Sequence, residues 1–310
     1  MSRNYGLGSR NMASAARIAL DRAAQRGELS FSSVATLTER FSQFSDAARA
    51  QGIGRLERIS AELVQAYGQQ LAAQVQHGEL SPAYAQNLVS AINTVMHLVR
   101  DWSSVSPTKV CGIAQRCAVR DTPPLAVDRT VLERALEQLR GDNQLRAAAV
   151  ADLARELGLR SKEAALLNAH KALQEARERG LVTIVDGTKG GRPRAVPILQ
   201  EQQLSALANA ATLQGTDRSL IPVEQNWKQF RENTLRQGRG PLQRVGITGY
   251  HDLRAAYACE RYQQLTGHPA PVIAGGIVDK HLDRIARQQI SAELGHGRID
   301  VVAEYIGGRG

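Results

Sequence analysis

Six side chains in the second half of the chain are of the types that act on a phosphodiester. They are Arg160, Lys189, His251, Arg254, His296 and Tyr305. Arginine can hold the non-bridging oxygens of a phosphate with two parallel hydrogen bonds. Histidine and lysine can donate or accept protons, and a tyrosine hydroxyl can attack phosphorus as a covalent nucleophile. As a set, these residues predict a site for phosphoryl transfer.

Taken one at a time, the same residues have ordinary structural interpretations. Arg160 can be one half of a surface ion pair, Lys189 an exposed turn lysine, and Tyr305 a docking aromatic. Other phosphoryl-transfer chemistries lack their residues, because the chain has no Asp-x-Asp pair for magnesium and no Gly-x-x-x-x-Gly-Lys-Ser/Thr loop. We therefore expect neither a metal ion nor any other cofactor.

The elements of the first part of the chain are predicted to be four helices. They are expected at 11–26, at 33–51, from Ser60 to Gly78, and from Ser81-Pro82 to about Trp102. Serine before a helix and glycine after it are the usual caps, and proline is favoured in the first turn. Prolines and serines then interrupt any regular pattern in 103–127, which predicts a linker.

The second part is predicted to be helical apart from one hairpin. A capping box at Thr130–Glu133 opens one helix, a second runs from about 144 to Leu157, and a third persists from Ser161 to Gly180. Strand-like runs at 181–185 and 195–198 enclose a basic, glycine-rich turn. We therefore predict a mainly α protein with a small antiparallel β-hairpin.

Composition favours a polyanionic partner. The 39 Lys and Arg against 30 Asp and Glu give a net charge of +9, and the pI is about 9.8. A basic protein that simply stays soluble is the alternative. No apolar run approaches the length of a membrane span. The three cysteines form no disulfide framework and the N-terminus lacks a secretory signal, so we expect a cytoplasmic protein.

The motifs, in their order, resemble those of the tyrosine recombinases of the phage and mobile-element integrase type. The segment Gly158-Leu159-Arg160-x-x-Glu163 resembles the first arginine box, and Lys189 falls on the hairpin that carries the family's lysine. His251-x-x-Arg254, Leu294-Gly295-His296 and Tyr305 resemble the remaining boxes.

The resemblance implies a two-domain architecture and a reaction. Residues 1–104 would form a helical, SAM-like core-binding domain, 105–127 a linker and 128–310 the catalytic domain. The implied activity is site-specific cleavage and rejoining of double-stranded DNA at attachment sites, which integrates or excises a mobile element without metal or ATP. A homo-tetramer on DNA and a bacterial, nucleoid-associated location are also implied.

The resemblance also implies a role for each residue. Tyr305 attacks the scissile phosphate and forms a 3′-phosphotyrosyl link, while Arg160 and Arg254 stabilise the charge on phosphorus. Lys189 protonates the departing 5′-oxygen, His251 exchanges a proton with Tyr305, and His296 hydrogen-bonds the phosphate.

One spacing departs from the family pattern, and the motifs leave other interpretations open. His251 and His296 lie 45 residues apart, longer than is usual in the family, and the surplus falls in 267–287. The alternatives are a non-catalytic DNA-binding protein of the same fold, a strand-cleaving relative such as a type IB topoisomerase or telomere resolvase, and an unrelated basic scaffold.

Overall fold

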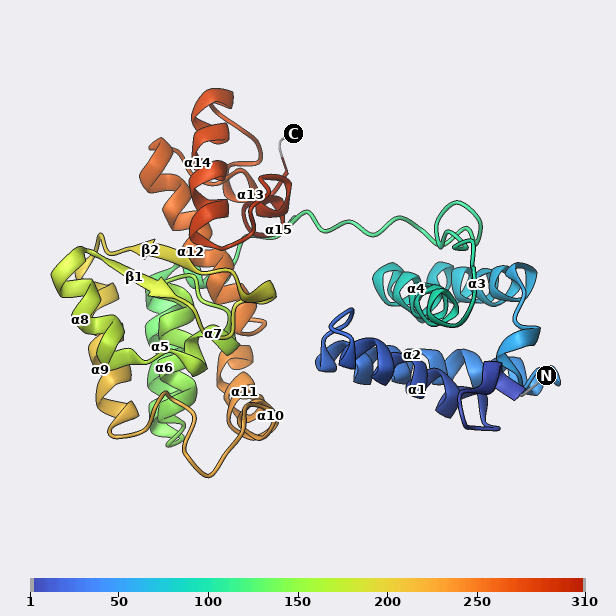
Figure 1. The fold of residues 1–310 in the computed structure, drawn as a ribbon. Helices are drawn as coiled ribbons and strands as arrows, with labels where there is room; N and C mark the ends of the chain where they lie inside the picture. The colour runs from blue at the N-terminus through green and yellow to red at the C-terminus, as the bar shows by residue number, and fades with distance from the viewer. Residues whose placement is uncertain (1–2, 309–310) are drawn as a thin grey trace. The chain divides into compact units, whose positions relative to one another are not determined.

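The structure is a computed structural model that describes residues 3–308 (Figure 1). The chain divides into two compact units, Met1–Cys117 and Ala118–Gly310. The division between them falls within 105–127. None of the helices in 3–308 is long and apolar enough to cross a membrane.

The first unit is built from four helices, as predicted. They are α1 (Met12–Gln25), α2 (Phe31–Ala50), α3 (Ala61–Gln76) and α4 (Pro82–Val99), joined by the short turns η1 (Arg3–Gly6) and η2 (Leu56–Arg58). Each helix begins with a side-chain cap on a free backbone N–H, supplied by Asn11, Ser30, Ser60 and Ser81. Phe41, Phe44, Leu88 and Ile92 are among the core residues.

Part of the expected linker packs into this unit. Val105, Cys111 and Ile113 are buried there. Asn93 fixes the start of the segment: its Nδ2 donates to the Val105 carbonyl at 2.9 Å, and its Oδ1 accepts from the Trp102 indole at 2.9 Å and from the Val105 amide at 3.0 Å. These contacts satisfy every polar atom of a buried amide side chain.

The second unit opens with helices that form its centre. They are η3 (Leu125–Val127), α5 (Arg129–Gly141), α6 (Leu145–Glu156), α7 (Ser161–Leu166) and α8 (Ala169–Arg179). After the hairpin come α9 (Glu201–Gln214), α10 (Trp227–Phe230), the π-helical turn η5 (Arg231–Leu235), α11 (Arg236–Arg244) and α12 (Tyr250–Thr266). The chain continues through α13 (Pro271–Ala274), α14 (Lys280–Glu293), η6 (Asp300–Val302) and α15 (Ala303–Ile306). Helix α6 packs between α9 and α12 (Figure 1).

The hairpin pairs β1 (Leu181–Ile184) with β2 (Arg194–Pro197) in antiparallel register, Leu181 opposite Pro197 and Ile184 opposite Arg194. Its tip contains the short turn η4 (Lys189–Gly191). Within residues 3–308, these two strands form the only β-sheet. The predicted fold class, mainly α with a small antiparallel hairpin, is therefore confirmed.

Two local predictions were wrong. Helix α5 is capped by Asp128, whose side chain accepts from the Thr130 amide, so there is no capping box at Thr130. The helix predicted over 161–180 is two helices, because the backbone is extended at Leu167 and Asn168. Asn168 caps the second of them through the Lys171 amide at 3.1 Å, since asparagine competes with the helical backbone for its own hydrogen bonds.

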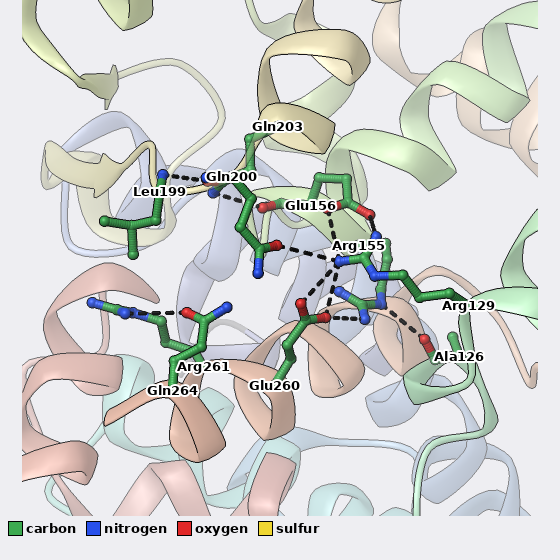
Figure 2. Close-up of polar contacts among 10 residues, drawn as sticks. All are labelled: Ala126, Arg129, Arg155, Glu156, Leu199, Gln200, Gln203, Glu260, Arg261 and Gln264. Atoms are coloured by element: carbon green, nitrogen blue, oxygen red, sulfur yellow. Dashed lines mark hydrogen bonds and ion pairs between the residues drawn. The ribbon is translucent and has the colours of Figure 1, made fainter. Parts of the chain in front are cut away.

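A partly buried charge network joins three helices of this unit (Figure 2). Arg129 at the start of α5 donates to Glu156 at 2.7 Å and to Glu260 of α12 at 2.9 Å. Arg155 of α6, only 1% exposed, also donates to Glu260, and its Nε donates to the Ala126 carbonyl at 2.8 Å. The network therefore fixes α12, the helix of the His-x-x-Arg box, against the end of α6, where the first arginine box begins.

Candidate active site

Five of the six predicted residues meet in the second unit. Arg160 lies between α6 and α7, His251 and Arg254 on the first turns of α12, His296 in the turn after α14, and Tyr305 on α15. The contacts described below join these side chains into one cluster. The fold thus gathers residues that are up to 145 positions apart, from 160 to 305.

Arg254 is the centre of the cluster and is fully buried. One terminal nitrogen donates to the carbonyl of Gly158, and the other donates to the carbonyl of Leu294 at 2.6 Å. Burial lowers the pKa of Arg254 to about 10, so the group stays cationic at neutral pH. Its guanidinium is therefore a fixed positive charge whose plane is set by two backbone carbonyls.

The hydroxyl of Tyr305 accepts a hydrogen bond from Arg254. Arg254 Nε lies 3.3 Å from the Tyr305 hydroxyl, and His296 Nε2 lies 3.0 Å from the same oxygen. The His251 ring lies beside the Tyr305 ring, with centroids 5.2 Å apart. The tyrosine is 1% exposed. Its hydroxyl therefore sits among three of the groups that the proposed chemistry requires.

The tautomer of His296 follows from its neighbours. Arg254 Nη2 lies 3.2 Å from His296 Nε2, and a guanidinium can only donate. Nε2 must therefore be the unprotonated nitrogen, and the Tyr305 hydroxyl then donates to it. Burial lowers the pKa of His296 to about 3, with Arg254 adding to the effect. A neutral imidazole lone pair thus faces the tyrosine proton.

The His251 ring lies beside the Tyr305 ring, but no hydrogen bond joins these two described side chains. Its pKa is also lowered, first by desolvation and then by the charges of Arg254, Arg120 and Arg160. At neutral pH this ring is uncharged as well. Of the two histidines, His296 rather than His251 lies at hydrogen-bond distance from the tyrosine oxygen.

Glu163 is the carboxylate that pairs with the arginines of the cluster. It is fully buried, and it accepts from Arg160 Nη1 at 2.7 Å and from two nitrogens of Arg194 at 2.9 and 2.6 Å. Arg254 lies 3.6 Å away. Burial alone would raise the pKa of Glu163, but the hydrogen bonds and charge of Arg194, followed by Arg160 and Arg254, lower it overall. The carboxylate is therefore ionised and offsets three positive charges.

Lys189 is the predicted residue that the structure does not bring into the cluster. It is exposed at the hairpin tip, and it has no hydrogen bond or ion pair to any residue in 3–308. The tip nevertheless approaches the start of α7. A Cβ at Gly187 would lie 3.0 Å from the Lys162 carbonyl, so glycine permits this close approach two residues from Lys189.

Two arginines behave differently from the sequence-based interpretation. Arg194, which the sequence places in the basic turn, instead belongs to β2, is buried, and donates to Glu163 and to the Glu293 carbonyl. The signal that could have identified it is strand alternation, because Arg194 and Val196 share the buried face of β2. Arg120, which falls in the segment predicted to be a linker, pairs with the buried Asp252.

Sequence reasoning also missed a second layer behind the cluster. Glu293 of α14 accepts from the Tyr257 hydroxyl at 2.8 Å and from Arg261 at 3.0 Å, which ties α14 to α12 ahead of the turn that carries His296. Gly158 has a φ of 61°, and a Cβ there would lie 2.5 Å from Tyr257. Glycine at this position lets the first arginine box pack directly on α12.

Known structures share the fold of this chain, and part of its sequence matches a known family. Residues 114–260 match the sequence family described as Integrase. A lambda integrase dimer bound to a COC′ core site is similar over 94% of this chain and 95% of the other, at 15% identity and a TM-score of 0.59. The Tn1549 transposon integrase in complex with circular intermediate DNA matches over 97% and 96%, at 12% identity and 0.58. The XerH site-specific recombinase bound to palindromic difH substrate matches over 96% and 81%, at 16% identity and 0.57. No curated protein matches the chain.

Proposed function

We propose that this chain, which has the fold of the tyrosine recombinases and matches the integrase family over residues 114–260, is a site-specific DNA recombinase. The observation that carries the proposal is the environment of the Tyr305 hydroxyl. A buried arginine donates to it and a neutral histidine accepts from it. A purely structural tyrosine would need one such partner, not a cation and a base that converge on one oxygen.

The reaction begins when Tyr305 attacks phosphorus. The tyrosine oxygen forms a bond to phosphorus, the bond from phosphorus to the 5′-oxygen breaks, and a 3′-phosphotyrosyl link remains. The hydroxyl proton passes to a neutral imidazole, with His296 Nε2 at 3.0 Å and the His251 ring alongside. A 5′-hydroxyl from another strand reverses the step, so the energy of the phosphodiester bond is conserved and no nucleotide is consumed.

The two arginines bind the non-bridging oxygens. Arg254 keeps its two carbonyl contacts and offers the phosphate the donors that now face Tyr305 and His296. Arg160 is partly exposed and uses one terminal nitrogen on Glu163, which leaves further donors for DNA. Losing one such preorganised donor costs about 2.7–4 kcal/mol of transition-state stabilisation.

Lys189 is proposed to protonate the departing 5′-oxygen. Its exposed position requires the hairpin tip to move toward the cluster when DNA binds. The tip contains Gly190 and Gly191 at φ values of 77° and 68°, which are accessible to glycine at little cost. Motion at the tip leaves the base of the hairpin in place, since Arg194 anchors β2 to Glu163.

Double-stranded DNA is the proposed partner of both units. Residues 1–104 would act as the core-binding domain, 105–127 as the connection and 128–310 as the catalytic domain. Exchange of strands between two duplexes requires four active sites, so we propose a homo-tetramer on DNA; a lambda integrase tetramer bound to a Holliday junction is one of the similar structures. The proposed setting is the bacterial cytoplasm, on the nucleoid, where the chain integrates or excises a mobile element.

Covalent trapping tests the proposal. Duplexes selected by binding from a random pool are nicked near the centre of the bound site, so that a short strand diffuses away after cleavage. Wild-type protein should then give adducts that survive a denaturing gel. Tyr305→Phe should bind the same DNA and form none, while Tyr84→Phe in the first unit should behave as wild type. Binding without adducts by the wild-type protein would support the non-catalytic alternative instead.

A further inference from the structure

The segment that follows Tyr305 is held by a buried arginine of α14. Arg287 is 1% exposed. Its Nη2 donates to the carbonyl of Gly307 at 3.1 Å and to the carbonyl of Gly308 at 3.0 Å. These two carbonyls belong to the residues that directly follow α15, so the arginine holds the chain just beyond the helix. The position of α15 is thereby fixed from α14.

Arg287 is itself oriented by two residues. Asp283, one turn earlier on α14, accepts from Arg287 Nε at 2.8 Å. The Tyr262 hydroxyl of α12 donates to the same aspartate oxygen at 3.2 Å. A continuous line of hydrogen bonds therefore runs from α12, which carries Arg254, through α14 to the residues after Tyr305. Helix α12 therefore contacts the Tyr305 hydroxyl through Arg254 and is connected through α14 to the residues that follow Tyr305.

A third contact comes from α13. Gly307 has a φ of 92°, and a Cβ there would lie 2.8 Å from the Val272 amide nitrogen. Only glycine allows the chain to turn this closely over α13. Val272, Asp283 and Arg287 all belong to 267–287, the segment that makes the spacing between the two histidines unusually long. We call these three residues the clasp.

The clasp matters because α15 cannot hold itself in place. It has four residues, too few for an isolated helix to be stable. The rate of an attack depends on where the attacking oxygen lies, and a displacement of about 1 Å can cost about a hundredfold. We propose that Val272, Asp283 and Arg287 act as a clasp for the nucleophile segment, with Arg287 as the residue that positions Tyr305. This proposal rests on the function proposed above.

Two assays distinguish the effect of a displaced Tyr305 from damage to the rest of the site. In the cleavage assay, Tyr305 must attack phosphorus. In a second assay, a DNA strand that carries a 3′-(p-nitrophenyl phosphate) is joined to a strand with a free 5′-hydroxyl. There the 5′-oxygen forms the bond to phosphorus, p-nitrophenolate departs with its electron pair, and the hydroxyl proton goes to solvent. The joining assay requires the arginines but not Tyr305.

Arg287→Gln is compared with Arg284→Gln, which removes an exposed arginine from the same helix. We expect Arg287→Gln to slow adduct formation about a hundredfold and to leave joining and DNA binding within about twofold of wild type. Arg284→Gln should change neither assay. Arg254→Ala should lose both activities, and it shows the result expected when the phosphate-binding groups themselves are damaged. If cleavage and joining fall together in Arg287→Gln, or if neither falls, the positioning role is wrong.

Two further measurements keep the proposal testable. Amide hydrogen exchange of 303–306 in the free protein should speed up in Arg287→Gln and not in Arg284→Gln; unchanged exchange would contradict the clasp. This measurement needs no DNA. It therefore still tests whether Arg287 holds α15 in place if the wild-type protein forms no adducts and the proposed function fails. Should Arg287→Gln not fold, Asp283→Asn is the second variant, and it should show the same split between the two assays.

Discussion

Replacing Glu163 with glutamine should destabilise the second unit more than any other charge-neutralising substitution in the cluster. The carboxylate receives hydrogen bonds from the Arg160 backbone amide, from Arg160 Nη1 and from two nitrogens of Arg194. Glutamine keeps one acceptor oxygen and turns an N–H₂ group toward guanidinium donors. The variant therefore loses hydrogen bonds and leaves three positive charges without their counter-charge.

The magnitude follows from burial. Arg254 is 0% exposed and Arg194 8%, so neither can recover its hydration when the carboxylate charge is removed. Breaking a buried pair in this way costs about 3–5 kcal/mol. For a domain of this size, that loss lowers the melting temperature by about 6–20 °C, at 2–4 °C per kcal/mol.

The pH dependence has a definite sign. The pKa of Glu163 in the folded protein is lowered, so its stabilising effect is present above the pKa of the unfolded chain and is lost as the pH falls through the folded value. The difference in unfolding free energy between wild type and Glu163→Gln should therefore be largest near neutral pH and should narrow in acid.

Urea unfolding measures this difference. In a Trp102→Phe background, Trp227 is the remaining tryptophan, and it reports on the second unit. Glu137→Gln, at an exposed position of α5, is the matched control and should stay within about 0.5 kcal/mol of wild type. A loss below about 1 kcal/mol for Glu163→Gln, or a difference that widens in acid, would refute the reasoning.

Three other predictions test separate parts of the site. Ring NMR should find His296 neutral throughout the range in which a free histidine titrates, with a pKa of about 3 because of burial and Arg254; titration near 6.5 would contradict this. Lys189→Ala should cleave slowly and should be rescued by a substrate with a 5′-bridging sulfur, since a thiolate leaves without a proton. Arg160→Ala should gain no such rescue. If the sulfur substrate does not rescue Lys189→Ala, Lys189 is not the general acid. Gly158→Ala should destabilise the protein by about 2–5 kcal/mol in urea unfolding, from about 1–2 for the left-handed backbone and about 1–3 for overpacking; a neutral effect would show that the turn relaxes easily.

The sequence predicted the elements well where local signals were strong. Serine caps and apolar spacing located α3 and α4, and two strand-like runs around a glycine-rich turn located the hairpin. The break at Asn168 was missed because the residues on both sides are good helix formers and the interruption depends on tertiary contacts. One of these is the hydrogen bond from the Ala169 amide to Gln214 on α9, at 2.6 Å, which no local pattern reveals.

The sequence indicated residues that the fold brings together, but it did not indicate the contacts among them. Family motifs supplied Arg254, His296 and Tyr305, and the fold brings them together. The role of Arg194 was missed because an arginine in a basic turn suggests an exposed charge, and only the register of β2 shows that it points inward. Which histidine contacts the tyrosine oxygen depends on backbone geometry after α14, which sequence spacing does not specify.

The charge network of α5, α6 and α12 places a constraint on how this chain can change over evolution. Glu260 accepts from both Arg129 and Arg155, so its loss alone would remove the carboxylate that pairs with Arg155, which is 1% exposed (Figure 2). Loss of Arg155 alone would leave a carboxylate with one partner fewer. Because each single step is strongly unfavourable while an apolar replacement of the whole set can be neutral, these positions should vary together among descendants of this sequence or not at all. The helix that carries His251 and Arg254 is thus protected from gradual drift by residues that make none of the contacts described above for Tyr305.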